Sequence, residues 1–222
     1  PTVKVQHGFS PYGDDMFTVQ EYDGLNRETN LWLPVTKGGT NGEYVNPGIL
    51  KDAVKEFQPY GSDKNPYNRT VYDRSPFNEV VEQYGPGEDW HSGLRSVATD
   101  RMTNLSAEDA GVTLPMNVTP EHLIVRMYKV TDSGISSTGI YATASLDVTK
   151  TTDEDGNISY EFKDKLGRSI LSRQINGDEL HDTYMVYDGY GNIRFVLPPL
   201  ATDGLASNSS WTETNDILKK YA

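Results

Sequence analysis

One six-residue phrase recurs along the chain and constrains the fold more than any other feature. Residues 22–27 read Tyr-Asp-Gly-Leu-Asn-Arg, and residues 187–192 read Tyr-Asp-Gly-Tyr-Gly-Asn. Residues 163–168 (Lys-Asp-Lys-Leu-Gly-Arg) and 72–78 (Tyr-Asp-Arg-Ser-Pro-Phe-Asn) are looser copies. A phrase that returns in the same order indicates stacked copies of one supersecondary unit. The alternative, four unrelated hairpins that share common turn chemistry, stays open at this stage.

The residue types of the phrase fit the tip of a β-hairpin. The aromatic at its start would bring a large side chain to the buried face. The Asp that follows can accept hydrogen bonds from turn amides, and Gly or Asn three residues later suits a left-handed backbone. Arg27 and Arg168 end their copies, within reach of the acidic side chains of a neighbouring turn. The repeat-motif residues are Tyr22, Asp23, Arg27, Tyr72, Asp73, Asn78, Asp164, Gly167, Arg168, Tyr187, Asp188, Gly191 and Asn192.

Composition and alternation favour a mainly β fold. The chain has 20 Gly, 12 Pro and 14 Tyr among 222 residues and is only 36% hydrophobic, a mixture typical of many short strands separated by turns. We expect antiparallel β-hairpin repeats that form a curved, twisted sheet, with one or two short helices. The expected hairpins cover residues 17–35, 70–84, 158–173 and 183–197.

Two helices interrupt this pattern. Asn46 and Pro47 open a helical periodicity that continues to residue 57. Residues 214–216 could cap a second helix towards the end of the chain. The less regular middle is expected to contain a long connection at 104–120 and strands at 123–130 and 140–151.

The regularity of the phrase suggests a division of the chain into four regions. A lead-in is followed by a first repeat region that carries the helical insertion and the irregular middle. Regular hairpins come next, and then a linker with the start of a C-terminal helix. The boundaries are 1–16, 17–130, 131–200 and 201–222.

Charge and cysteine content exclude several classes of function. The net charge of −12 and the pI near 4.7 leave no basic surface for a phosphate backbone, so nucleic acid is not an expected partner. The absence of Cys excludes disulfides and thiolate metal sites. No apolar run reaches the roughly 18 residues of a membrane span. The chain opens Pro-Thr-Val-Lys-Val, which is expected for a mature or excised segment.

No cofactor, metal or catalytic residue is predicted. The four His residues are scattered without a metal-binding spacing. Residues 153–157 resemble the opening of a calcium loop, but the early Gly and the missing bidentate Glu favour a hairpin turn. Trp32 and Trp90 lie inside repeat motifs and are expected to pack. Trp211 follows a polar stretch and is the possible ligand-stacking residue.

These residues resemble the YD-repeat, or Rhs (rearrangement hotspot), family. The two Tyr-Asp phrases at 22–27 and 187–192 look like ordinary copies. Residues 75–90 are similar to the stretch that begins the repeat region in Bacteroidetes members, and residues 186–199 match the same subgroup. The resemblance covers most of residues 17–200. Lys at 163, Glu at 79 and Asn at 26 depart from the family pattern.

The resemblance implies a segment of a large secreted or cell-surface bacterial protein. In that family the repeats wind as a spiral β-sheet into a hollow shell around a C-terminal toxin or effector, so this chain would be a partial shell. The partners would be the rest of the parent polypeptide and its cargo, with self-association through exposed strand edges. No counterpart of the family's self-cleaving aspartate segment is found. Two alternatives stay open, namely an extracellular carbohydrate- or protein-binding β-module and an enzyme of unrecognised type.

Overall fold

The structure is mainly β, as predicted. Strands account for 44% of the chain and pair in antiparallel sheets, with short helices between them. No helix among the described residues is long and apolar enough to cross a bilayer. The curvature expected of a shell stays a prediction. The computed structural model describes residues 1–109, 111–132, 134–206 and 210–212.

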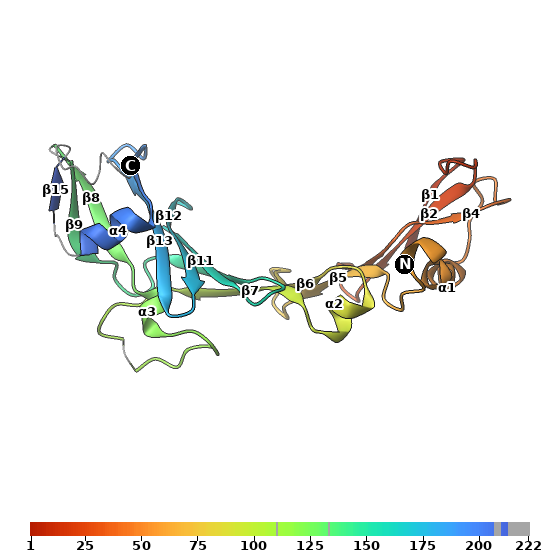
Figure 1. The fold of residues 1–222 in the computed structure, drawn as a ribbon, viewed down its shortest axis with the longest axis horizontal. Coiled ribbons are helices and arrows are strands. Elements are labelled where there is room, and N and C mark those ends of the chain that lie inside the picture. Colours follow the sequence, from red (N-terminus) through yellow and green to blue (C-terminus); the bar gives the residue numbers. More distant parts are fainter. Residues whose placement is uncertain (110, 133, 207–209, 213–222) are drawn as a thin grey trace. The chain divides into compact units, whose positions relative to one another are not determined.

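The chain divides into two compact units (Figure 1). Unit 1 contains residues 1–99 and the short turn 153–155, and unit 2 contains residues 100–152 and the described residues from 156 onward. The division falls inside one strand and differs from the four regions expected from the sequence. Those regions follow how regular the phrase is, whereas a compact unit is set by which strands and cores contact one another.

Unit 1 is an antiparallel meander in which each strand pairs with its predecessor or near predecessor. Its order is β1-β2-β3-β5-β6-β7, with β4 also paired to β2 (Figure 1). The strands are β1 (Thr2–Gln6), β2 (Asp15–Tyr22), β3 (Glu28–Trp32), β4 (Val35–Lys37), β5 (Tyr67–Tyr72), β6 (Val80–Tyr84) and β7 (Ser96–Thr103). Two short helical segments, a 3-10 turn (Gln58–Tyr60) and α2 (Glu88–Ser92), lie in the connections.

Helix α1 (Pro47–Glu56) packs against β2 and β4 and begins where the sequence predicts. The side chain of Asn46 accepts a hydrogen bond from the amide of Gly48 at 2.8 Å, and Pro47 occupies the first helical position. The apolar face of α1 meets the sheet in one buried cluster. This cluster consists of Phe17, Val19, Trp32, Val35, Leu50 and Val54.

Unit 2 continues from the second half of β7 as another antiparallel meander. Its order is β7-β10-β11-β12-β13-β14. A separate three-stranded sheet has the order β15-β9-β8. The strands are β8 (Arg126–Thr131), β9 (Gly134–Ile140), β10 (Asp147–Thr152), β11 (Ile158–Lys163), β12 (Ser169–Asn176), β13 (Glu179–Tyr187), β14 (Ile193–Leu197) and β15 (Ser210–Thr212).

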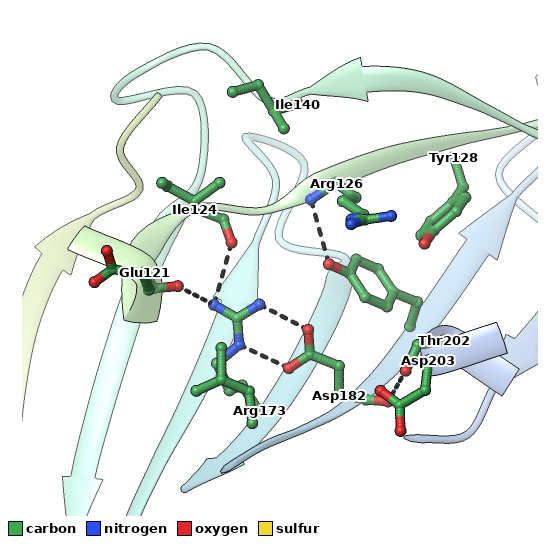
Figure 2. Close-up of a pocket in the computed structure, with 11 residues that line it drawn as sticks. Glu121, Ile124, Arg126, Tyr128, Ile140, Arg173, Asp182, Thr202 and Asp203 are labelled. Atoms are coloured by element: carbon green, nitrogen blue, oxygen red, sulfur yellow. Dashed lines mark hydrogen bonds and ion pairs between the residues drawn. The ribbon is translucent and has the colours of Figure 1, made fainter. Parts of the chain in front are cut away.

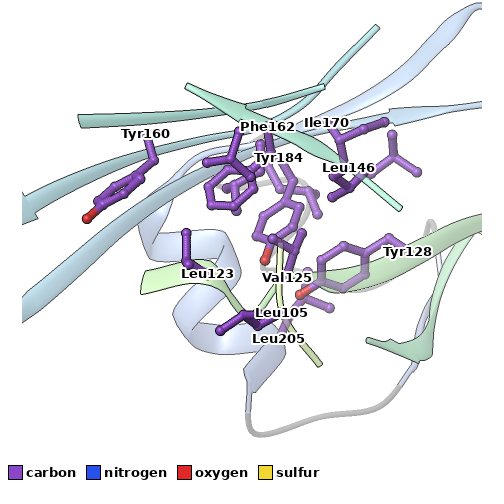
Figure 3. Close-up of a cluster of buried hydrophobic side chains, with 14 of the residues drawn as sticks. Leu105, Leu123, Val125, Tyr128, Leu146, Tyr160, Phe162, Ile170, Tyr184 and Leu205 are labelled. Atoms are coloured by element: carbon purple, nitrogen blue, oxygen red, sulfur yellow. The ribbon is translucent and has the colours of Figure 1, made fainter. Parts of the chain in front are cut away.

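The core of unit 2 lies between its large sheet and a second layer. The second layer consists of the small sheet, α3 (Pro120–Leu123) and α4 (Pro199–Ala206), and Figure 3 shows its side chains facing those of the large sheet. The tie between layers is partly polar, because the Tyr184 hydroxyl accepts from the Arg126 amide at 3.2 Å. The best-buried members of the cluster are Leu123, Val125, Ile135, Leu146, Tyr160, Phe162, Leu171, Leu197 and Ala201.

The prediction of one strand over 140–151 is wrong. Strand β9 ends and β10 begins inside this range, and a turn separates them. The fully buried Asn104 holds the turn, since its amide nitrogen donates to the Ala142 carbonyl at 2.9 Å and its oxygen accepts from the Leu146 amide at 2.7 Å. Ala144 has φ 57°, a left-handed conformation that ends the extended run.

The predicted strand over 123–130 is shorter in the structure. Leu123 closes the helix α3, which follows Thr119, and the strand begins only at Arg126. The amide of Thr119 donates to Nδ1 of His122 at 3.2 Å, so the first helical turn is held by a side chain that alternation does not reveal.

Both ends of the chain contain structure that the sequence did not predict. The expected lead-in 1–16 contributes β1, which pairs along β2. The expected linker after residue 200 forms most of α4, and β15 pairs with β9. The helix predicted from 214 lies outside the described residues.

Candidate functional site: the hairpin turns and the Arg173 recess

The four copies of the phrase form four hairpin turns. We number them by chain order as the first (23–27), second (73–79), third (164–168) and fourth (188–192) turn. The strand ladder shifts register directly before each turn, at Tyr22, Tyr72, Lys163 and Tyr187. Such a bulge bends the strand and re-aims the side chain at that position. The recurrence of the phrase therefore corresponds to one recurring backbone geometry.

Three of the turns have the same five-residue closure. The amide of the leading Asp donates to the carbonyl of the residue four positions later, at 2.9 Å in each turn (Asp23 to Arg27, Asp164 to Arg168, Asp188 to Asn192). The fourth residue of each turn has a positive φ, 60° at Asn26, 78° at Gly167 and 86° at Gly191. Gly and Asn tolerate this conformation best, so the residue types predicted it correctly.

The Asp carboxylate caps its own turn. One carboxylate oxygen accepts from the amides two and four residues later, at 2.8 Å from Leu25 and 3.0 Å from Arg27 in the first turn. The third and fourth turns repeat these bonds at 2.9 to 3.0 Å. This satisfies amides that the bulged ladder leaves unpaired.

Each arginine pairs with the Asp of its own turn. Nε of Arg27 donates to Asp23 at 2.7 Å, and Nε of Arg168 donates to Asp164 at the same distance. The expectation that these arginines contact acidic side chains of a neighbouring turn is therefore wrong. The ion pair is local, and it orients the guanidinium within its own turn.

The guanidinium of each arginine lies over the tyrosine ring of the next turn. Cζ of Arg27 is 4.7 Å from the ring centroid of Tyr72, and Cζ of Arg168 is 4.8 Å from that of Tyr187. Arg27 also donates to the carbonyl of Asp73 at 3.1 Å. Tyr72 is partly exposed, whereas Tyr187 is partly buried and packs against the core cluster of unit 2, as expected of an aromatic at this position. Each turn thus contacts its neighbour through a cation–π pair.

Two turns depart from the pattern. The second turn has seven residues between its strands, and its Asp73 amide reaches the Glu79 carbonyl at 2.9 Å. Oδ1 of Asp73 has no hydrogen-bond partner in the part of the chain that the structure describes. Asn78 has φ 57° and lies 3.5 Å from Arg27. In the fourth turn, Asn192 occupies the arginine position and donates back to Asp188.

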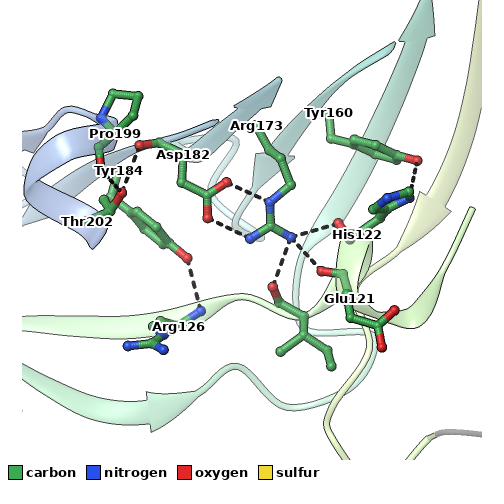
Figure 4. A network of polar contacts seen from close by, with 10 residues as sticks. Glu121, His122, Arg126, Tyr160, Arg173, Asp182, Tyr184, Pro199 and Thr202 are labelled. Atoms are coloured by element: carbon green, nitrogen blue, oxygen red, sulfur yellow. Dashed lines mark hydrogen bonds and ion pairs between the residues drawn. The ribbon is translucent and has the colours of Figure 1, made fainter. Parts of the chain in front are cut away.

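Unit 2 contains a buried ion pair that the sequence analysis missed. Arg173 on β12 is 3% exposed and donates to both carboxylate oxygens of Asp182 on β13, at 2.6 and 2.7 Å. Its third nitrogen donates to the backbone carbonyls of Glu121 and His122 in α3 and of Ile124 directly after it (Figure 4). One feature of the sequence could have revealed it. Arg173 lies two residues after Leu171 in a strand, so both side chains point to the same, buried face of the sheet.

A recess of about 400 Å³ lies beside this pair (Figure 2). Its lining is mixed, with Glu121, Arg126, Tyr128 and Asp203 around it. Both oxygens of Asp182 are occupied by Arg173, so this carboxylate is not free to act as a base. Burial raises the pKa of the Tyr184 phenol at the wall of the recess. The recess can bind a small polar group, but its innermost charges stabilise the fold.

The other predicted residues have ordinary structural roles. Trp32 is buried in unit 1, and Trp90 on α2 packs over Gly85. The 153–157 stretch forms a hairpin turn with Gly at φ 86°. Trp211 lies in β15 opposite Ile135, and its side chain is outside the described part. Within the described ranges, no group of three or more His, Asp or Glu is placed to hold a metal ion.

Comparison with known proteins assigns one family model to the first half of the chain. The model, described as "Domain of unknown function (DUF6443)", matches residues 1–103. The match ends at the last residue of β7, so it covers residues 1–99 of unit 1 and the rest of the strand that leads into unit 2. No curated protein matches the chain.

We expect a coupling energy of about 0.5–1 kcal/mol between Arg27 and Tyr72, because the guanidinium lies on a partly exposed ring. The measurement is a double-mutant cycle of Arg27→Ala and Tyr72→Leu by urea unfolding. Arg74→Ala, an exposed arginine in the second turn, is the matched control and should show no coupling with Tyr72→Leu. Additive single effects at Arg27 and Tyr72 would contradict the lateral contact.

Acid should weaken the turns. Hydrogen bonds from the Arg27 and Asn192 amides lower the pKa of Asp23 and Asp188, respectively. For Asp164, desolvation raises the pKa but the bonds from Arg168 and Leu166 outweigh it, so this pKa is lowered too. A carboxyl with a lowered folded pKa contributes stability above its unfolded pKa of about 3.9 and loses it as the pH falls through the folded value.

We therefore expect the urea midpoint to fall as the pH drops below about 4 and these carboxylates take up protons. Asp188→Asn should be less stable at pH 7 and should lose less on acidification. Asp178→Asn, in the exposed turn between β12 and β13, is the control and should follow the unmodified chain. Parallel acid losses in Asp188→Asn and the unmodified chain would argue against the capping role.

Removing Arg173 should destabilise unit 2 by about 3–5 kcal/mol, because Asp182 would be left as an uncompensated buried charge. The Arg173→Met variant tests this by urea unfolding, and the exposed Arg194→Met is the control. The double variant Arg173→Met/Asp182→Leu should recover much of the loss. A double variant no more stable than Arg173→Met would mean that the carbonyl contacts, rather than the charge pair, dominate.

Proposed function

We propose that this chain is a structural segment of a large exported bacterial YD-repeat protein, a part of the wall around a C-terminal toxin or effector. The observation that carries the proposal is the lateral contact between turns. The arginine of one turn lies on the tyrosine of the next in both units, at 4.7 and 4.8 Å. A contact that always points to the next copy can be repeated for as long as hairpins are added.

The strand pairing supports the same proposal. Among the described residues, β1 pairs with one strand, β2, and β14 pairs with one strand, β13. An antiparallel meander can be extended at such edges by further hairpins of the parent polypeptide, and unpaired edges also attract other chains. The partners proposed are therefore the adjoining repeats and the enclosed cargo, with self-association of the isolated segment through its edges.

The charged side chains are used for structure in this proposal. The turn carboxylates accept hydrogen bonds from the backbone of their own turns, and Arg173 and Asp182 in unit 2 bind each other. We assign no reaction to the segment, and its role is containment of a cargo encoded elsewhere in the same polypeptide.

A second candidate, an extracellular carbohydrate- or protein-binding β-module, is favoured by the recess of about 400 Å³ in unit 2. Its wall combines the aromatic Tyr128 and Tyr184 with charged side chains, a lining suited to a small polar ligand. A glycan array with Tyr128→Ala and Trp211→Ala variants tests it. Binding that depends on Tyr128 would support a carbohydrate-binding module. The absence of binding to any sugar on the array would contradict it.

The shell proposal is tested on the complete polypeptide that contains this chain. Its reading frame should encode further Tyr-Asp hairpins and a distinct C-terminal domain. Limited proteolysis of the complete polypeptide should leave the C-terminal domain intact. The same domain should be digested rapidly when it is produced alone. Arg168→Ala combined with Tyr187→Leu should accelerate its digestion, whereas Lys165→Ala, exposed in the same turn, should not. Equal digestion of the enclosed and isolated domain would refute containment.

A further inference from the structure

The arginine and the tyrosine of each lateral pair face each other across neighbouring strands. In the β3–β5 ladder, Leu31 is opposite Asn68, and continuing that register places Arg27 opposite Tyr72. In the β12–β13 ladder, Leu171 is opposite Tyr184, and the same continuation places Arg168 opposite Tyr187. The cation–π contact is therefore a cross-strand pair at a defined position, directly after the bulge.

The third turn shows what happens when the partner differs. Here Lys163 occupies the tyrosine position, and the residue opposite it in the β10–β11 ladder is Asp147. The same Asp147 forms an ion pair with Lys165 at 2.7 Å. Lys163 itself forms an ion pair with Glu161 of its own strand at 2.9 Å. The position after the bulge thus carries an aromatic ring in the two turns where an arginine lies over it, and the third turn has neither the ring nor the arginine at this pair of positions.

The first turn has the ring without the cation. Tyr22 is 37% exposed, and no described arginine or lysine lies over it. In the β1–β2 ladder, Thr2 is opposite Gln20. If this register is continued past Thr2, the position opposite Tyr22 is the one directly before Pro1. Arg27 cannot fill it, because its guanidinium is already placed between Asp23 and Tyr72.

We infer that the ring of Tyr22, at the edge of the first turn, binds an arginine side chain. This arginine would end an adjoining hairpin turn and lie directly before β1. The occupant follows from the other turns, because the two other tyrosines at this position both lie under an arginine. The identification of the donor as a preceding repeat of the same polypeptide rests on the proposed function. The chemistry of the position rests only on contacts within unit 1 and unit 2.

The test adds one residue in front of Pro1 and measures unit 1. Chains extended by Arg or by Ala are compared in the Tyr22 and Tyr22→Leu backgrounds, with amide hydrogen exchange of the β1–β2 pair and urea unfolding as readouts. We expect the added Arg to lower the opening equilibrium constant about 2- to 5-fold relative to Ala, as for a partly exposed cation–π pair. This difference should disappear in Tyr22→Leu. An extension by Lys should give a smaller effect, because an ammonium lacks the flat stacking face.

The Arg27–Tyr72 pair is the internal standard of this experiment. If Arg27→Ala raises the opening constant through Tyr72 but the added Arg does nothing at Tyr22, the inference is wrong while the lateral contacts remain. If an Arg extension is effective in Tyr22 and Tyr22→Leu alike, the benefit comes from charge alone and the inference is also wrong. Neither outcome depends on an enclosed cargo, so a failure here is distinguishable from a failure of the shell proposal.

Discussion

The organisation of the sheet depends on an arginine held between its own turn and the next one. The ion pair with Asp164 holds the guanidinium of Arg168 within its own turn, and the same guanidinium lies over the ring of Tyr187 in the next turn. Each contact is small, about 0.5–1 kcal/mol for the cation–π part, because both groups are partly exposed. The contact matters because it fixes the register of neighbouring strands. A slip of one residue would move the guanidinium off the ring and turn every buried side chain of the strand outward.

The apolar clusters provide the larger part of the stability, and they differ between the units. Unit 1 covers its sheet with α1, which arrives from the connection between β4 and β5. Unit 2 builds a second layer from α3, α4 and the small sheet β15-β9-β8, and Arg173 joins that layer to the large sheet through the carbonyls of Glu121, His122 and Ile124. Helix α1 is inserted between β4 and β5, and α3 with β8 and β9 is inserted between β7 and β10, whereas α4 and β15 follow β14. The hairpin turns keep their geometry around these additions. Repeat proteins tolerate insertions of this kind because each repeat contacts mainly its neighbours.

The turns and α1 could be predicted because their geometry is set by nearby residues. Gly and Asn report a left-handed backbone, and Asn46 with Pro47 reports a helix start. What failed depends on distant partners. The break after Ile140 is imposed by Asn104, some forty positions earlier, and α3 is held by a histidine that strand alternation cannot reveal. The arginine that lies over Tyr72 or Tyr187 was not predicted, because it belongs to another turn and cannot be identified from local sequence.

The lateral contact has a direction, and this explains where it stops. Each pair consists of an arginine that precedes a strand and a tyrosine that ends the next one, so a turn without arginine cannot continue the series. The second turn has Glu79 before its return strand and the fourth has Asn192. The series therefore consists of two pairs, Arg27 with Tyr72 in unit 1 and Arg168 with Tyr187 in unit 2. Between the second and third turns the strands stay hydrogen-bonded in the order β6-β7-β10, but no arginine–tyrosine pair joins the turns there in the part of the chain that the structure describes.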